Sequence, residues 1–561
     1  MSPTVNVATH LANLATIAPT RPAIHMPQRD GSYVTLTFAE LDALSGRLAR
    51  GLTEVGIRRG MHTTLMVPPS IDFFALTFAL FKVGAVPVLI DPGMGIRNLG
   101  KCLAEAKPEA FIGIPKAHVA RRVLGWAKDT VRVTVTTGSR LFGGQHTTKS
   151  LLKIGDRLGP LPVADTRADE TAAILFTSGS TGVAKGVVYT HGIFAAQIDY
   201  LREIYGIEYG EVDLSTFPLF ALFGPALGMT AVVPVMDPTR PAEVDPVKIV
   251  NAVLQFKVTN LFGSPALLNR VGKYADEEQI QLYSLRRVIS AGAPVPAKVI
   301  ERFKQCLMPE VQIFTPYGAT ESLPVANIGS DRILGETRHL TDQGKGVCVG
   351  VPVTGMKVRI IPITDDPIPK FDESTWLPPY EIGEIAVSGP VVTAEYFGRP
   401  QATALAKMHD ETGRLWHRMG DVGYFDDQGR LWFCGRKSHR VVTKDGTLFT
   451  IPCEGVFNTH PDVFRSALVG VEINGQIEPV ICFEREPVSG RRSLRVNWRS
   501  EIDVIEEVML SEELHQIGQR FPHTRHITRF LEHPKFPVDI RHNAKIFREK
   551  LAVWAATKVK A

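Results

Sequence analysis

Cysteine is scarce and carries no metal-binding pattern in this sequence of 561 residues. The six cysteines include no Cys-x-x-Cys pair and no arrangement spaced with histidine for a metal. The absence argues against a disulfide scaffold and a structural zinc site, and it is typical of reduced thiols in a cytosolic protein. The N-terminus lacks a basic start followed by an apolar core, so we expect no secretory signal and a cytoplasmic location.

A large excess of one charge is missing as well. The net charge is only +5, so the composition does not indicate a nucleic-acid partner. Repeats and low-complexity tracts are also absent. The length of 561 residues exceeds that of one domain, and the hydrophobic share of 44% is enough for large cores.

Charged side chains are absent from one long segment, residues 214–236, which is long enough to span a bilayer. Pro218, Pro225 and Pro234 interrupt it, and they would leave backbone groups of a membrane helix without hydrogen bonds. We therefore expect no transmembrane span and interpret the segment as the wall of an apolar cavity.

The chain shows a regular alternation of short apolar strands and amphipathic helices. Residues 63–69, 70–84 and 85–92 predict a strand, a helix and a strand, and similar patterns recur at 257–275 and 285–305. This alternation predicts an α/β fold with mostly parallel sheets. The composition changes after "GRLWFCGRKSHR", so we place a boundary near Arg436 between a large N-terminal and a small C-terminal region.

The first motif with chemistry is "FTSGSTGVAKGVVYTHG", at residues 176–192. Its glycines lie too close together for the Walker loop of nucleoside triphosphatases, and Gly186 follows Lys185 where that loop needs Ser or Thr. Its hydroxyls and glycines still suit a phosphate. We expect strands at 171–176 and 186–191 to flank the loop; a plain Gly/Ser hairpin is the alternative.

Two further blocks carry groups that suit a nucleotide. "SAGAPV", residues 290–295, predicts a tight turn of small residues against which a planar base can lie. In "TPYGATES", Tyr317 offers a face for stacking, Thr320 a hydroxyl and Glu321 a carboxylate suited to Mg²⁺ beside phosphates. Taken alone, each block has a simpler explanation as a turn.

Two later blocks add a carboxylate and basic side chains. In "WHRMGDVGYFDDQGRLWFCGR", Asp421 suits two ribose hydroxyls and Arg436 suits the ribose or a phosphate. The alternative is a pair of hairpin turns with surface charges. The last block, "HNAKIFREK", contains Lys545, for which the alternative is an ordinary solvated lysine.

In this order, the five blocks resemble the adenylate-forming superfamily of acyl-CoA synthetases, luciferases and nonribosomal adenylation domains. The resemblance extends from Leu36 to Leu551. It implies a large N-terminal multi-sheet α/β domain, residues 1–435, and a smaller mobile C-terminal α+β lid domain, residues 436–561. It also implies ATP and Mg²⁺, and attack of a carboxylate on ATP that gives acyl-AMP and pyrophosphate.

The resemblance implies a role for individual residues. The loop over the ATP phosphates would comprise Thr177, Ser178, Gly179, Ser180, Thr181, Gly182 and Lys185. The adenine would contact Ala291, Gly292, Ala293, Pro294, Tyr317, Gly318, Ala319 and Thr320. Asp421 and Arg436 would hold the ribose, and Glu321 would hold Mg²⁺. Lys545, Thr181 and Glu321 are the predicted catalytic residues; Lys545 would bridge the carboxylate and the α-phosphate. The predicted substrate pocket comprises Phe220, Ala221, Phe223, Ala226 and Gly263.

The sequence departs from the family pattern at residues that serve the second half-reaction, in which the acyl group leaves AMP for an acceptor. Ser438 and His439 replace two acidic residues of the usual hinge, and Gly446 lies one position late. Ala544 replaces the glycine before the lysine, and Ala221 stands where many relatives have histidine. These changes argue against transfer of the acyl group to coenzyme A.

Residues 437–461 and 536–552 resemble the β-lactone synthetases of bacterial long-chain olefin biosynthesis. That resemblance implies a 2-alkyl-3-hydroxy fatty acid, whose carboxylate is adenylated and whose 3-hydroxyl then closes a cis-3,4-dialkyl-β-lactone with loss of AMP. The 214–236 segment would suit two alkyl chains. The resemblance also implies an assembly with the hydrolase and the dehydrogenase of the pathway.

Three alternatives stay open: a long-chain fatty acyl-CoA (or acyl-AMP) ligase, a nucleotide-binding scaffold without catalysis, and a membrane-surface module. His191, His439 and His542 are candidates for the base that deprotonates the 3-hydroxyl, and none of them is assigned.

Overall fold

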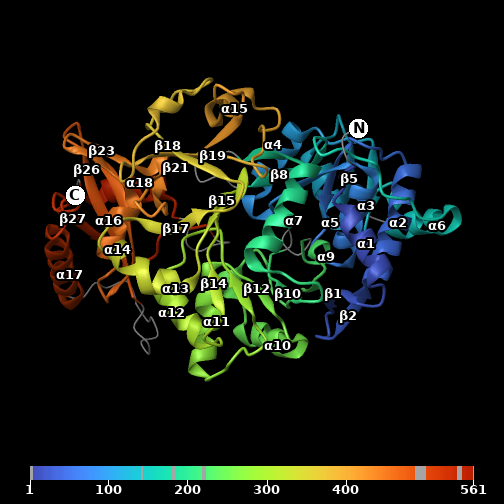
Figure 1. The fold of residues 1–561 in the computed structure, drawn as a ribbon, viewed down its shortest axis with the longest axis horizontal. Helices are drawn as coiled ribbons and strands as arrows, with labels where there is room; N and C mark the ends of the chain where they lie inside the picture. Colours follow the sequence, from blue (N-terminus) through green and yellow to red (C-terminus); the bar gives the residue numbers. More distant parts are fainter. Residues whose placement is uncertain are drawn as a thin grey trace.

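The computed structural model describes residues 4–139, 143–177, 184–217, 223–486, 501–539 and 546–559. Within these ranges the chain forms two seven-stranded sheets, one eight-stranded sheet and two smaller sheets. Figure 1 shows the N-terminal elements at one end of the molecule, the C-terminal ones at the other and the eight-stranded sheet's segments between them. No helix in the described ranges combines the length and the apolar character needed to cross a bilayer.

The first seven-stranded sheet carries the two strands that flank the Gly-rich loop. Its strands are β7 (His146–Thr147), β6 (Val133–Thr136), β5 (Ala110–Gly113), β3 (His62–Met66), β4 (Val86–Ile90), β8 (Thr171–Thr177) and β9 (Lys185–Thr190), in spatial order. All neighbours are parallel except β8 and β9, which are antiparallel. The predicted strands on either side of the loop are confirmed.

Helices cover this sheet, and one of them is buried along most of its length. They are α2 (Phe38–Glu54), α3 (Ile71–Val83), α4 (Ile96–Ala106), α5 (Pro115–Leu124), α6 (Thr148–Leu158) and α7 (His191–Tyr205). Helix α3 is apolar all round and buried from Phe73 to Val83, as expected for a helix inside a large core. Gly84, at φ +74°, ends it in the left-handed conformation that glycine adopts without strain.

The second seven-stranded sheet runs β14 (Gln312–Phe314), β13 (Arg287–Ile289), β12 (Asn260–Phe262), β10 (Val212–Ser215), β11 (Thr230–Val232), β1 (Pro22–Pro27) and β2 (Tyr33–Thr37). Only β1 and β2 are antiparallel. Its helices are α1 (Ala8–Ile17), α9 (Phe223–Leu227), α10 (Pro246–Phe256), α11 (Pro265–Glu277) and α12 (Ala297–Gln305). Leu214, Leu261 and Val288 point to one face and join the core beneath α10, α11 and α12.

The eight-stranded sheet is antiparallel throughout, which the strand–helix alternation does not predict. Its strands are β15 (Tyr317–Ala319), β16 (Ser322–Asn327), β17 (Val347–Pro352), β22 (Leu431–Arg436), β21 (Leu415–Phe425), β19 (Gly383–Ser388) and β18 (Lys357–Ile361), with β20 (Lys407–His409) beside β21. Short helices α13 (Ser330–Arg332), α14 (Arg338–Asp342) and α15 (Pro400–Ala406) interrupt the connections. Neighbouring antiparallel strands need only tight turns between them, so no helical repeat marks this region.

The C-terminal part has cores of its own. Its elements are β23 (Val441–Thr443), β24 (Gly446–Leu448), α16 (Thr450–Phe457), β25 (Val463–Ile473), β26 (Gln476–Arg485), α17 (Glu501–Gln519), β27 (Arg529–Glu532) and α18 (Arg548–Val559). Two hydrophobic clusters there are built from residues between Val441 and Val559. Strand β22 ends at Arg436, beside the predicted boundary; the division into two domains stays a prediction.

Candidate nucleotide and acyl site

Strand register brings together three of the side chains predicted for the nucleotide. Asp421 on β21 lies opposite Arg436 on β22. The hydroxyl of Tyr317, at the start of β15, donates a hydrogen bond of 2.7 Å to Asp421 Oδ2. Arg436 Nη1 lies 3.0 Å from Asp421 Oδ1 and donates to the Met419 carbonyl at 3.1 Å. The predicted ribose and adenine residues therefore meet in one buried cluster.

One carboxylate oxygen of this cluster is available as a hydrogen-bond acceptor for a ligand. Burial raises the pKa of Asp421, while the charge of Arg436 and the Tyr317 hydrogen bond oppose the rise. The Arg436–Asp421 Oδ1 contact lacks the direction of a hydrogen bond, so within the described residues this buried oxygen accepts none. Because a buried acceptor without a donor is costly, Asp421 Oδ1 is suited to a ligand hydroxyl such as that of ribose.

Glu321, the predicted Mg²⁺ ligand, is held by a neighbouring loop. The Tyr396 hydroxyl donates to Glu321 Oε1 at 2.6 Å, and the Thr393 amide donates to the Glu321 carbonyl at 2.9 Å. Lys185 Nζ lies 4.6 Å from the centre of the Tyr396 ring. Burial lowers the pKa of Lys185, and Glu321 counteracts this. The carboxylate and the lysine therefore share one polar site.

No group of three or more metal-binding side chains occurs in the described part of the chain. Glu321 would therefore contribute one carboxylate to a cation whose other ligands come from phosphates and water. Mg²⁺ is commonly bound in this way, with one or two carboxylates and substrate oxygens. The hard oxygen of Glu321 beside Lys185 fits that chemistry.

Two buried basic side chains beside this site were missed by the sequence interpretation. Lys407 on β20 lies opposite His417 on β21. Lys407 Nζ donates to the carbonyl of Thr393, and no carboxylate lies within ion-pair distance of it among the described residues. Burial lowers the pKa of Lys407 to about 7, against the attraction of Glu321. The lysine inside the apolar stretch "LAKM" was the available signal, but no motif accompanies it.

The remaining nucleotide residues lie at the ends of strands. Thr177 and Lys185 are paired in register at the end of β8 and the start of β9. The segment from Ala291 to Pro294 lies between β13 and α12, with Gly292 at φ +97°. A side chain at Gly318 would meet the Ser322 carbonyl at 2.6 Å.

The other predicted residues of these blocks have the following positions. Ala319 ends β15 opposite Ser322, and the Thr320 carbonyl accepts a hydrogen bond from Tyr189. Outside the described residues lie Ser178, Gly179, Ser180, Thr181, Gly182, Phe220, Ala221, His542 and Lys545. Their predicted roles are not tested by the structure.

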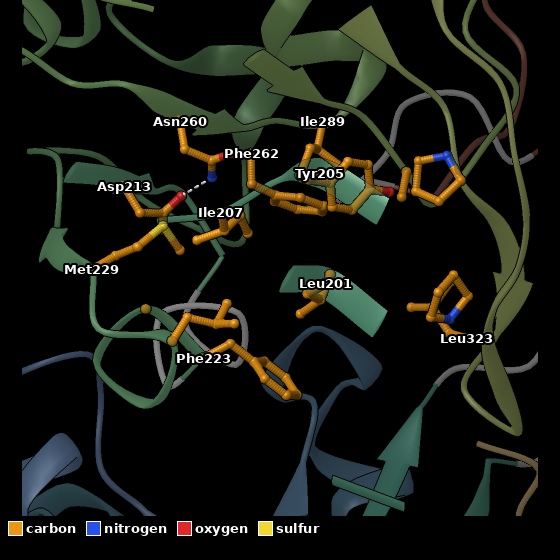
Figure 2. A pocket seen from close by; sticks show the side chains of 15 residues that line it. Leu201, Tyr205, Ile207, Asp213, Phe223, Met229, Asn260, Phe262, Ile289 and Leu323 are labelled. Atoms are coloured by element: carbon orange, nitrogen blue, oxygen red, sulfur yellow. Dashed lines mark hydrogen bonds between the residues drawn. The ribbon is translucent and has the colours of Figure 1, made fainter. Parts of the chain in front are cut away.

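An apolar pocket lies beside the nucleotide cluster (Figure 2). Ala291 and Pro316 line it next to the predicted adenine residues. The charge-free segment contributes Phe223, Gly224, Leu227 and Met229, which confirms the expectation that this segment lines a cavity. Helix α7 supplies Leu201 and Tyr205 from the opposite side.

The pocket does not include every residue predicted for it. Phe223 lines it, whereas Ala226 is buried nearby and is not among the lining residues. Gly263 lies against Leu261, Leu267 and Leu268 instead. Contact of the substrate with Ala226 and Gly263 stays a prediction.

The hinge block is attached to the eight-stranded sheet by basic side chains. Lys437 Nζ donates to the Thr364 carbonyl at 2.7 Å and lies 3.2 Å from Glu384 Oε2. Arg440 Nη2 lies 2.8 Å from Asp365 Oδ2. These contacts fix residues 437–440 at the end of β22.

Two of the three candidate histidine bases are buried. Burial lowers the pKa of His191 to about 4, and its ring lies 6.2 Å from that of Phe81. Burial also lowers the pKa of His439 to about 4, and its Nε2 lies 3.4 Å from Glu549 Oε1 on α18. Both rings are therefore neutral at pH 7, and neither has a contact with the nucleotide cluster among the described interactions.

Comparison with known proteins agrees with this arrangement. The olefin beta-lactone synthetases of Xanthomonas campestris pv. campestris and Stenotrophomonas maltophilia are each 50% identical to the chain, over 99% of it and 98% of their own length. The structure of the amide bond synthetase McbA from Marinactinospora thermotolerans shares the fold, with a TM-score of 0.76 and 21% identity over 98% of this chain and 99% of that one. The family model described as "AMP-binding enzyme" matches residues 12–397. The chain thus belongs to the family of AMP-binding enzymes.

Proposed function

We propose that the protein is an ATP-dependent β-lactone synthetase. It adenylates the carboxylate of a 2-alkyl-3-hydroxyalkanoic acid, releases pyrophosphate, and closes the acyl-AMP to a cis-3,4-dialkyl-β-lactone with release of AMP. The observation that carries the proposal is the 50% identity, over almost the whole chain, to two olefin beta-lactone synthetases. The apolar pocket beside the nucleotide cluster supports it, because the acid carries two alkyl chains.

In the adenylation step, the nucleotide cluster positions ATP. Asp421 Oδ1 accepts a ribose hydroxyl, Arg436 lies beside it, and the ring of Tyr317 stacks on the adenine. The hydrogen bond from Tyr317 to Asp421 couples the base and ribose contacts, so both are oriented together. Ala291–Pro294 and Gly318–Thr320 complete the base site.

The charges of the reacting groups require compensation, because a carboxylate attacks an anionic phosphate. Lys185 and the loop from Thr177 to Gly182 bind the leaving phosphates, and Lys545 bridges the carboxylate and the α-phosphate. Glu321, oriented by Tyr396, would hold Mg²⁺, which supplies positive charge beside the phosphates.

Ring closure needs proximity and the exclusion of water. The anhydride is open to hydrolysis, and an apolar pocket keeps water from it. The internal 3-hydroxyl needs no diffusing partner, so the conformation imposed on the two alkyl chains supplies much of the advantage, while the anhydride drives closure against ring strain. Coenzyme A has no role in this step.

The same proposal implies a domain organisation, a cellular location and partner enzymes. Residues 1–435 form the adenylation domain and 436–561 a mobile lid, supported by the separate clusters after Val441. Six free, buried cysteines support a cytoplasmic location. The hydrolase and the dehydrogenase of olefin biosynthesis would be its partners in an assembly.

Mass analysis of products from ATP, Mg²⁺ and a 2-alkyl-3-hydroxy acid tests the proposal, with and without coenzyme A. We expect the lactone, AMP and pyrophosphate in both reactions. A thioester formed only when coenzyme A is added would instead support a long-chain acyl-CoA ligase. Release of no pyrophosphate from any such acid would contradict both activities.

A further inference from the structure

One end of the apolar pocket is polar, and strand register explains why. Asp213 on β10, Asn260 on β12 and Arg287 on β13 occupy one row across the sheet. Two residues further toward the carboxyl ends of the strands, the same face carries Ser215, Phe262 and Ile289, and the last two line the pocket. On β12 and β13 this face of the sheet therefore changes from polar to apolar over two residues.

The polar row lies at the end of the pocket farther from the predicted reaction site. Ala291 and Pro316, beside the adenine residues, follow the carboxyl ends of β13 and β14. Figure 2 shows Asp213, Asn260 and Met229 on one side of the pocket and Leu323, two residues after Glu321, on the other. A chain entering from the reaction site would pass the apolar residues and end at Asp213 and Asn260.

This polar end contains an acceptor with no donor among the residues that the structure describes. The Ser215 hydroxyl donates to Asp213 Oδ2 at 2.6 Å, and Asn260 Nδ2 donates to Asp213 Oδ1. Asn260 is only 4% exposed, yet its Oδ1 accepts no hydrogen bond within the described residues. Asn260 lines the pocket, so this end of the pocket carries a buried polar side chain to which a methyl group can donate no hydrogen bond.

Next to Asn260 in this row, Arg287 forms a buried ion pair with Glu211. Arg287 Nη2 lies 3.0 Å from Glu211 Oε1, and both side chains are buried. The Thr259 hydroxyl donates to Glu211 Oε2 at 2.9 Å. An alkyl chain extended past Asn260 would therefore have to enter a buried polar layer.

We propose that Asp213 and Asn260 form the polar end of the alkyl pocket and set the longest chain that it accepts. The inference rests on the proposed function, since it takes the occupant to be an alkyl chain of the substrate. A chain that stops short of Asn260 contacts apolar side chains. One or two further methylenes press against the hydrogen-bonded Asp213–Asn260 pair and have to disturb its hydrogen bond to be accommodated.

The expected effect is a sharp length limit. Loss of a hydrogen bond to a buried group corresponds to roughly 10-fold or more in kcat/KM for the first acid long enough to disturb the Asp213–Asn260 pair. Extra methylenes in a purely apolar pocket would give a gradual change in the opposite direction, because each buried CH₂ increases binding.

The test is a series of 2-alkyl-3-hydroxy acids that differ by single methylenes in each alkyl chain, with kcat/KM measured from pyrophosphate release and lactone formed. The double variant Asp213→Ala/Asn260→Ala removes both polar groups together. We expect its length limit to move by about two carbons toward longer chains, as read from the relative kcat/KM values along the series. An unchanged limit in this variant would overturn the inference.

A second variant tests the same length limit, and a control variant tests whether lower stability alone changes it. Asn260→Gln keeps the amide and adds one methylene to the side chain, so the limit should shorten by about one carbon. If the double variant does not fold, an unchanged limit in Asn260→Gln overturns the inference. Leu261→Ala alters the adjacent residue on the opposite face of β12, within the core, and should leave the limit unchanged despite lower stability.

The two failures are distinguishable. If the unaltered protein releases no pyrophosphate and forms no lactone from any acid of the series, the proposed function is wrong. If it forms lactone and the limit of the double variant, or of Asn260→Gln where the double variant does not fold, is unchanged, the function stands and the role of Asp213 and Asn260 is wrong.

Discussion

The two sides of Arg436 are held in place by different forces. Before it, strand register orients the site: Asp421 lies opposite Arg436 on buried strands, as Asp213 lies opposite Asn260 in the second sheet. After it, residues 437–440 depend on ion pairs of two kinds: Lys437 lies beside Glu384, whose side chain is buried, whereas Asp365, the partner of Arg440, has a side chain 70% exposed. Exposed ion pairs contribute little, about 0–1 kcal/mol, so the Arg440 contact can change at low cost while the nucleotide cluster keeps its geometry.

The largest effect should come from the segment beyond the hinge. Lys545→Ala should slow adenylation by about 10²-fold or more, because it removes a positive charge predicted at the carboxylate and the α-phosphate. The rate of pyrophosphate release measures this step. Lys550→Ala is the matched control, since Lys550 is an exposed lysine on α18. Equal rates in the two variants would show that another residue supplies the charge.

The next largest effect should come from the nucleotide cluster of Tyr317, Asp421 and Arg436. Asp421→Ala should weaken ATP binding by about 2–4 kcal/mol, which is roughly 30-fold or more in Kd, because the ribose loses a charge-assisted acceptor. Isothermal titration with ATP measures the change. Asp365→Ala removes an exposed carboxylate instead and should leave Kd nearly unchanged. An unaltered Kd in Asp421→Ala would place the ribose elsewhere.

What the sequence could predict was local or motif-based. The strands around the Gly-rich loop and the helix at 70–84 follow from apolar periodicity, and the structure has them as β8, β9 and α3. The cavity wall followed from a charge-free segment too rich in proline to be a membrane helix. Such signals depend on neighbouring residues, so they are readable without the fold.

What the sequence could not predict depends on long-range pairing. Glu321 and Tyr396 are 75 residues apart, and Asp213 and Asn260 are 47 residues apart. Lys407 reaches Thr393 only because β20 pairs with β21. No local pattern encodes these contacts, because the fold brings together residues that are not neighbours in the sequence.

The stability of the protein should depend on pH through Asp213, which pairs with Asn260. Burial raises the pKa of Asp213 to about 6, above its unfolded value, so the native state binds the extra proton between about pH 4 and pH 6. The associated stability is present below pH 4 and is lost as the pH rises through 6. Asp213→Asn removes this loss, and it should raise the melting temperature at pH 8 by more than at pH 4.5. An equal change at both pH values would contradict the shift.

The smallest effect should be found at the hinge. Arg440→Ala should change stability by less than about 1 kcal/mol, because its partner Asp365 is largely solvated. Thermal unfolding at low and high salt measures it, and the difference from the unaltered protein should shrink as salt screens the pair. A large, salt-independent loss of stability would show that the hinge is as firmly fixed as the nucleotide cluster.

In the proposed mechanism, activation and ring closure are separate steps on one enzyme, and no external acceptor takes part. A single-turnover experiment with a 2-alkyl acid that lacks the 3-hydroxyl separates the two steps, with acyl-AMP and pyrophosphate followed by mass analysis. We expect acyl-AMP to form and persist, coenzyme A not to discharge it, and the 3-hydroxy acid to give AMP and the lactone instead. Efficient conversion of the stalled acyl-AMP to a thioester by coenzyme A would rule out this mechanism and identify an acyl-CoA ligase.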